Sequence, residues 1–327
     1  MDRDGFRAAL EEIGYTEEQV CDCLSAVDEF EAFLKRPGRP GTLEEASGED
    51  VRAFAAELIA EQRNARIAFL GVYRYATYVR NHRMTVGAVE LLGGYEMLGR
   101  LYDRIASELG ADVRDRVFAG VELPVLGTPP LEWARTTAVV MPRLEAEADP
   151  AMVKHVLDDG IRTFREDAHA DFKRQLEESD SIDAFLEGRR LRHLDMLKGH
   201  RDDGTLYYDQ EITDDLIDLV ERHPEIGGGV RRGNTIIEIK IPHRGAEYLA
   251  ADDERLKRYH ACHCPLAKES IPWDDLVVPP SICEICPSFN RKPWEVAFGR
   301  KLESEILESA LRGGRWCKFA IHLPASA

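Results

Sequence analysis

The chain has 327 residues, a net charge of −17 and a pI of about 5.1. With 44% hydrophobic and 31% charged residues, its composition is that of a folded globular protein rather than a disordered one. No apolar run reaches the roughly 20 residues that cross a bilayer. Because the N-terminus also lacks an apolar signal core, we expect a cytoplasmic protein with no membrane partner. Such an acidic chain repels a phosphate backbone, which argues against nucleic acid as a partner.

The first third of the chain has the periodicity of a helical bundle. Thr16 and Gln19 form a capping-box pattern at a helix start. Apolar residues then recur at helical spacing: Val20, Cys23, Leu24, Val27, Phe30 and Leu34. A second stripe follows at 51–59, and the nearly all-apolar stretch 67–79 indicates a helix inside the bundle, with its tyrosines in the core rather than in a pocket. Breaks at 127–130 and 149 place the bundle at 1–135.

Residues 136–327 show mixed signals that predict an α+β domain. Asp149 and Pro150 begin the first of the helices that we expect to run through about Lys173, and another is expected over 181–198, where an arginine cluster indicates a solvated face. Short strands are expected at 206–208 and 235–241, and Thr213 starts another helix between them. The glycines at 227–229 indicate a turn rather than a phosphate loop, because neither Gly-Lys-Ser/Thr nor GxGxxG is present.

Cysteine is concentrated near the C-terminus. Cys23 fits the core stripe of its helix, and Cys21 has no assigned role. The other five fall in the last fifth of the chain: Cys262, Cys264, Cys283, Cys286 and Cys317. In a reducing compartment such clustering favours a metal site over disulfides. A C-x-C pair followed by a C-x-x-C pair supplies the thiolates that zinc prefers, so zinc is the expected cofactor.

Five thiols exceed the four positions of a tetrahedral zinc site. Our first choice is Cys264, Cys283, Cys286 and Cys317, with Cys262 almost equal to Cys264. His263 is a candidate nitrogen ligand, and His260 is expected on the surface. Two alternatives stay open. The thiols could be unrelated core residues, or Cys264 could be a nucleophile with His322 as its base.

The end of the chain resembles a known family. The segments Leu302–Ser309 and Gly313–Phe319 combine an acidic apolar stretch, a glycine turn and Cys-x-Phe. They are similar to the last elements of vinyl-4-reductase-type domains and of L-2-amino-thiazoline-4-carboxylic acid hydrolase-like proteins from an uncharacterised bacterial family. The resemblance covers roughly the last 65 residues and implies that 301–311 is a strand, although periodicity alone also permits a helix there.

The resemblance also implies a ligand set. Sensing members hold zinc through an upstream cysteine, a Glu-x-x-Cys and the cysteine of Cys-x-Phe, which Cys317 matches and Cys283 completes upstream. Ser309 and Ile306 stand where the middle cysteine and the glutamate would be. Cys286 and Cys264 would therefore take their places.

These patterns lead to one preferred function and one alternative. We expect a zinc-binding protein whose C-terminal α+β domain, with a small antiparallel sheet beside the cysteine site, binds a small organic molecule as a sensor or accessory protein. A closed four-ligand site supports folding and leaves no position for catalysis. The alternative is a hydrolase of a small cyclic C–N or C–S substrate that uses a reactive thiol or a metal-bound water. Whether the chain is an enzyme or a homodimer is left open.

Overall fold

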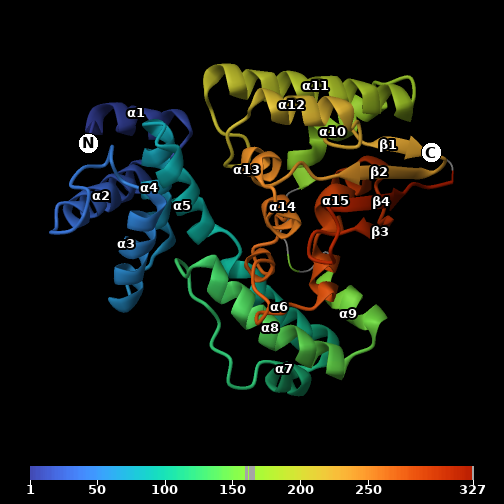
Figure 1. Ribbon diagram of the computed structural model, residues 1–327, viewed down its shortest axis with the longest axis horizontal. Coiled ribbons are helices and arrows are strands. Elements are labelled where there is room, and N and C mark those ends of the chain that lie inside the picture. The colour runs from blue at the N-terminus through green and yellow to red at the C-terminus, as the bar shows by residue number, and fades with distance from the viewer. Residues whose placement is uncertain (159–160, 162–165, 326–327) are drawn as a thin grey trace. The chain divides into compact units, whose positions relative to one another are not determined.

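The computed structural model describes residues 1–158, 161 and 166–325, and it divides into two compact units. The first unit comprises Met1–Glu96 with Glu122–Trp133, and the second comprises Met97–Val121 with Ala134–Ala327. Figure 1 shows the helices and strands of both units, coloured by residue number from the N-terminus to the C-terminus. The second unit contains all the clustered cysteines.

The first unit is a bundle of amphipathic helices. They are α1 (Arg3–Glu12), α2 (Glu17–Leu34), α3 (Gly48–Ala60), α4 (Arg66–Tyr78) and α5 (His82–Leu92). Thr16 and Gln19 form the predicted capping box at the start of α2. Cys23 is fully buried in the core of this unit, as its helical stripe predicted. Tyr75 is also buried there, whereas the Tyr78 hydroxyl donates to the Asp2 carboxylate at the surface.

Four helices of the second unit precede its sheet region in sequence. They are α6 (Tyr95–Leu109), α7 (Ala111–Val117), α8 (Pro130–Glu147) and α9 (Pro150–Leu157). Arg143 on α8 donates to the carbonyl oxygens of Val117 and Ala119, and Arg116 pairs with Glu147 at 2.7 Å. These contacts tie α7 to α8, so residues 97–121 fall in the second unit although the sequence-based division at 135 placed them in the first.

The helices that follow differ in length from those expected. Asp149 caps α9 as predicted, and this helix ends at Leu157. Residues 159–160 and 162–165 lie outside the described residues. The chain then forms η1 (Glu166–His169), α10 (Ala170–Glu177), α11 (Ile182–Asp203) and α12 (Asp214–Arg222), the last beginning at the predicted Thr213. Figure 1 shows α11 and α12 side by side next to the sheet.

The stretch 206–208 is a tight turn and not the strand we expected. Tyr207 and Gln210 exchange both backbone hydrogen bonds, at 3.0 and 3.2 Å. Between them, Tyr208 and Asp209 have φ values of +46° and +60°. Two successive positive φ values define the compact turn of a two-residue hairpin, which glycine and asparagine normally occupy.

The sheet has four antiparallel strands in the order β1-β2-β4-β3. The strands are β1 (Val230–Arg232), β2 (Thr235–Ile239), β3 (Glu303–Glu308) and β4 (Lys318–His322). The expectation of an α+β fold with a small antiparallel sheet is thus confirmed, and 303–308 is a strand. Between β2 and β3 lie α13 (Gly245–Ala250), α14 (Glu254–Ala261), η2 (Lys268–Ser270), η3 (Pro280–Ile285) and α15 (Pro287–Phe298). Helix α15 packs on β3 and β4 (Figure 1).

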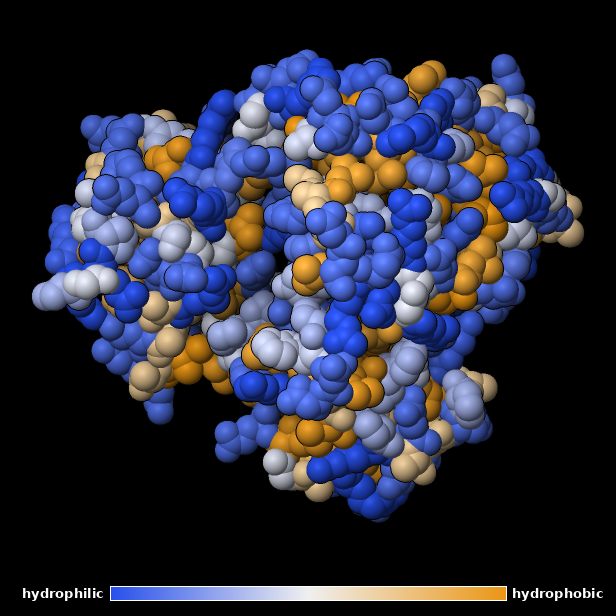
Figure 2. Space-filling model, in the orientation of Figure 1, coloured by the Kyte–Doolittle hydropathy of each residue, from blue (hydrophilic) through white to orange (hydrophobic). Residues whose placement is uncertain are grey.

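The visible surface is mainly hydrophilic. Figure 2 shows charged and polar side chains over most of this face, with hydrophobic ones scattered among them. Scattered apolar residues are usual on protein surfaces. Within the described part of the chain, no helix combines the length and apolar character required to span a membrane.

Candidate functional site

The tertiary structure gathers thiols from three places in the sequence. Cys262 follows α14, Cys283 and Cys286 lie in and after η3, and Cys317 precedes β4. Each is at most 6% exposed. Cys264 is buried as well, and its backbone N–H donates to the sulfur of Cys262.

Electrostatic effects show that four of these thiols are neighbours. Burial raises the pKa of Cys262 well above its usual range, and negative charge on Cys317, Cys283 and Cys286 raises that pKa further. Burial, followed by Cys286, raises the pKa of Cys283 to about 12 and that of Cys317 to about 11. Mutual elevation of this kind requires the sulfurs to be close together in a poorly solvated region. We call Cys262, Cys283, Cys286 and Cys317 the thiol cluster.

Several donors surround the thiol cluster. The Ser309 hydroxyl lies 3.1 Å from the Cys283 sulfur, so Ser309 contacts the thiol cluster. The guanidinium of Arg312 lowers the pKa of Cys283, and the backbone N–H of Ala310 lowers that of Cys317. Such donors stabilise thiolate over thiol. The cluster therefore combines burial with groups that favour negative charge.

The thiols are neighbours without being arranged around a common point. Among the residues that the structure describes, no three or more His, Cys, Asp or Glu side chains lie at the spacing of a bound metal ion. The donor type fits zinc, because thiolates are its preferred ligands. To coordinate one ion, the cysteine side chains would have to turn toward one another.

The three histidines considered from the sequence have different surroundings. His263 lies between Cys262 and Cys264, and its Nε2 is 2.6 Å from the carbonyl oxygen of Ile241. His260 is half-buried at the end of α14, and burial lowers its pKa. His322 lies at the far end of β4 from Cys317 and contacts Glu305 and Thr235, at 2.9 and 3.2 Å.

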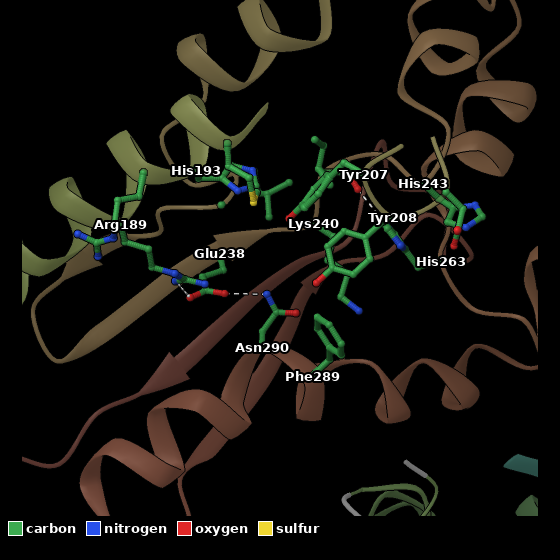
Figure 3. Close-up of a pocket in the computed structure, with 16 residues that line it drawn as sticks. Arg189, His193, Tyr207, Tyr208, Glu238, Lys240, His243, His263, Phe289 and Asn290 are labelled. Carbon is green, nitrogen blue, oxygen red and sulfur yellow. Dashed lines mark hydrogen bonds and ion pairs between the residues drawn. The ribbon is translucent and has the colours of Figure 1, made fainter. Parts of the chain in front are cut away.

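A cavity of about 490 Å³ opens beside the thiol cluster within the second unit. Figure 3 shows its lining from α11, the 207–209 turn, β2 and the start of α15. The lining residues are Arg189, Arg192, His193, Met196, Tyr207, Tyr208, Asp209, Gly227, Glu238, Ile239, Lys240, Ile241, His243, His263, Phe289 and Asn290. Its volume is typical of a site for a small organic molecule.

Glu238 anchors one end of the cavity. This carboxylate is 3% exposed and accepts hydrogen bonds from Arg189 at 2.5 Å, Asn290 at 2.7 Å and the Trp294 indole at 3.2 Å. Arg189 also donates to the carbonyl oxygen of Gly228 at 2.9 Å. Because a buried carboxylate needs compensation of this kind, we assign this end a structural role. Arg189 is thus part of a half-buried ion pair and not the fully solvated side chain that the arginine cluster suggested.

The other end of the cavity holds two histidines. The rings of His243 and His263 meet edge to face, with centroids 5.0 Å apart. The buried ammonium of Lys268 donates to Nδ1 of His243 at 3.1 Å. Burial, then the Lys268 charge, lowers the pKa of His243 well below its usual range. His243 is therefore neutral near pH 7, with its remaining proton on Nε2.

Lys240 joins the cavity to the thiol cluster. Its side chain lines the cavity, and its backbone N–H donates to the carbonyl oxygen of Cys317 at 3.0 Å. Its ammonium lowers the pKa of Cys317 and lies 5.0 Å from the centre of the Phe289 ring. His263, from the segment between Cys262 and Cys264, also lines the cavity. The two features therefore share a wall.

Comparisons with known proteins identify no relative. No protein-family model, no curated protein and no solved structure matches this chain. The arguments below therefore use only the residues and their geometry.

Sequence reasoning did not identify the cavity. One signal was present, because Arg189, Arg192, His193 and Met196 recur at the spacing of a single helix face and all four line the cavity. Their partners Glu238, Lys240 and Phe289 come from distant segments. Only the packing of α11 against the β1–β2 region brings them together.

Proposed function

We propose that the second unit binds one zinc ion at its thiol cluster and a small organic molecule in the adjoining cavity, as a sensor or accessory protein. The observation that carries this proposal is the position of Lys240, which contributes to both features. Four buried thiols supply a complete set of soft ligands, and a closed thiolate site stabilises a fold without providing an open position for chemistry.

The raised pKa values of Cys283 and Cys317 argue against either of these two thiols as a nucleophile. A reactive thiol has a pKa near or below neutrality and partial exposure. Cys283 and Cys317 are buried, with pKa values raised to about 12 and about 11. Grouped thiols of this kind ionise when they share a cation, because the metal charge replaces the missing solvation.

Metal content, combined with thiol titration, tests the zinc proposal. The protein is purified without chelator as wild type, Cys283→Ser and Cys21→Ser, the last changing an exposed cysteine of the first unit. We expect one zinc per chain in the wild type and in Cys21→Ser. In Cys283→Ser the zinc is lost and the second unit unfolds at lower denaturant concentration. Metal-free wild-type protein with one rapidly reacting thiol at neutral pH would favour the cysteine hydrolase instead.

Two further variants determine whether Cys262 or Cys264, the two cysteines of the C-x-C pair, binds the ion. The electrostatic neighbours of Cys262 are Cys317, Cys283 and Cys286, so we propose Cys262 as the fourth ligand. Cys262→Ser should then lose zinc, while Cys264→Ser retains it. The reverse result would assign Cys264, our first choice from the sequence.

A further inference from the structure

Within the described part of the chain, two of the three cations that line the cavity form no ion pair with a carboxylate, unlike Arg189 at the Glu238 end. Arg189 is paired with Glu238. For the other two cations of the lining, Arg192 and Lys240, no carboxylate partner occurs among the described residues. Asp209 also lines the cavity, so the wall carries three cations and two carboxylates, a local exception in a chain with a net charge of −17. Such a wall attracts an anion and holds it in a partly desolvated site.

A third polar group of the wall also lacks a partner. Nε2 of His193 is buried and has no hydrogen-bond partner among the residues that the structure describes. Burial, then the Arg189 charge, lowers the pKa of His193 to about 4, so the ring is neutral near pH 7. A buried polar atom of this kind is normally satisfied by a ligand or an ordered water. His193 is thus a neutral hydrogen-bonding group that lines the cavity beside Arg192.

The rest of the wall is flat and aromatic. Tyr207, Tyr208 and Phe289 line the cavity, and the rings of Tyr207 and Tyr208 meet at 4.6 Å between centroids. Figure 3 shows the Tyr208 and Phe289 rings on either side of the Lys240 ammonium in this view. Tyr208 and Phe289 are 53% and 41% exposed, an exposure that a bound apolar group would reduce.

Backbone strain holds Tyr208 in this position. Its φ of +46° is unfavourable for a bulky side chain, and Asp209 follows at +60°. The turn is fixed by the paired hydrogen bonds of Tyr207 with Gln210 and by Arg244, which donates to the Asp209 carbonyl. Strain that the surroundings impose is concentrated at binding sites, where it presets the position of a side chain.

From these observations we propose that the cavity binds an organic carboxylate with a flat apolar body. The carboxylate pairs with the Lys240 ammonium, and the flat body lies against Tyr208 and Phe289 beside it. This inference rests on the proposed function, because it specifies the class of small molecule that the cavity takes.

Three probes separate the charge of the ligand from its shape. 2-Naphthoate carries both the charge and the flat body, 2-naphthamide has the same body without the charge, and cyclohexanecarboxylate has the charge without a flat body. Calorimetric titration of the zinc-loaded full chain should give an affinity for 2-naphthoate at least tenfold above that for either of the other two. Raising the salt concentration should lower the affinity for 2-naphthoate and leave the affinity for 2-naphthamide unchanged.

Matched variants locate the contacts. Lys240→Met should weaken the binding of 2-naphthoate about tenfold, which corresponds to about 1.4 kcal/mol. Lys318→Met and Arg232→Gln, which change a lysine and an arginine outside the cavity lining, should leave the affinity unchanged. Phe289→Leu should lower the affinity for 2-naphthoate more than the affinity for cyclohexanecarboxylate. Each variant is compared at a temperature where its melting curve shows it to be folded.

The outcomes distinguish this inference from the function on which it rests. If 2-naphthamide binds as tightly as 2-naphthoate, or if the cavity variants bind 2-naphthoate like the control variants outside the lining, the carboxylate assignment is overturned while small-molecule binding stands. If none of the three probes binds, both the ligand class and the small-molecule part of the proposed function fail. The zinc content per chain then tests the metal-binding part of that function separately.

Discussion

The backbone N–H of Lys240 donates to the carbonyl oxygen of Cys317 at 3.0 Å, while the Lys240 side chain lines the cavity. One residue thus fixes the position of a cluster cysteine through its main chain and contributes to the cavity through its side chain. The two contributions can be separated by mutation, because only proline removes the N–H.

Lys240→Pro and Lys240→Met should therefore behave differently. The proline variant leaves the Cys317 carbonyl without its donor and should lower the free energy of unfolding by about 1–3 kcal/mol. It should also retain less zinc than the wild type. The methionine variant keeps the N–H and should retain zinc while it loses affinity for 2-naphthoate. Urea unfolding and metal analysis measure both effects. Equal zinc loss in the two variants would show that the ammonium, and not the backbone contact, stabilises the cluster.

Gly227 is required by its contact with His193 and not only by its backbone angle. A Cβ at Gly227 would lie 2.1 Å from Cδ2 of His193, whereas a Cβ at Gly233 meets nothing within 4 Å. Both glycines have positive φ, +75° and +61°. We expect Gly227→Ala to lower the free energy of unfolding by about 1–3 kcal/mol more than Gly233→Ala, because it overpacks the wall. Paired urea denaturation measures the difference, and equal losses would remove the role assigned to the contact.

Arg291 is the centre of a buried ion network in the second unit. Its guanidinium donates to Glu295 at 2.8 Å, to Asp158 at 2.8 Å and to the Ser304 hydroxyl at 2.9 Å, and the residue is 2% exposed. Arg291→Met leaves two carboxylates without their main partner and should cost about 3–5 kcal/mol. The exposed Arg300→Met serves as the control and should change stability by less than about 0.5 kcal/mol. Thermal or urea unfolding of both variants gives the comparison.

His193 should make the second unit sensitive to acid. Its folded-state pKa of about 4 lies below its ordinary value of 6.5, because burial and then the Arg189 charge oppose protonation. Between these values the unfolded chain binds the proton and the folded chain does not, so stability is complete above pH 6.5 and falls as the pH drops toward 4. The loss at this residue is on the order of 2–3 kcal/mol. Burial lowers the pKa of His169, His243 and His260 as well, so they add to the same trend.

His193→Gln should flatten the acid limb of the stability curve. Glutamine does not titrate, so the variant should lose less stability than the wild type between pH 6.5 and pH 4. Urea unfolding at several pH values follows this difference. Parallel curves for the two proteins would show that His193 has an ordinary pKa in the folded chain.

The two cysteines of α2 provide a contrast within one helix. Cys23 is fully buried and Cys21 is exposed. Cys23→Ser places a hydroxyl in an apolar core and should lower the free energy of unfolding of the first unit by about 1–3 kcal/mol. Cys21→Ser should change it by less than about 0.5 kcal/mol. A guanidinium titration of both variants tests this, and similar values would contradict the burial of Cys23.

The sequence by itself determined the features that depend on local chemistry. The capping box of Thr16 with Gln19, the N-cap at Asp149 and the core position of Cys23 follow from residue type and periodicity within a few residues. The strand at 303–308 was expected from the family resemblance, because its apolar spacing permits either a helix or a strand. The turn at 207–210 was missed, because tyrosine and aspartate occupy positions where glycine or asparagine would have signalled it.

Only the tertiary structure decided which residues form the cavity and which thiols are neighbours. Cys262 and Cys317 are separated by more than fifty residues, and Lys240 comes near Cys317 because β2 pairs with β4. Spacing in sequence reports the periodicity of one element, whereas the distance between elements is set by pairing and packing among all of them. The sequence therefore contained the ligand types of a metal site, and the fold determined that a cationic, aromatic cavity lies beside them.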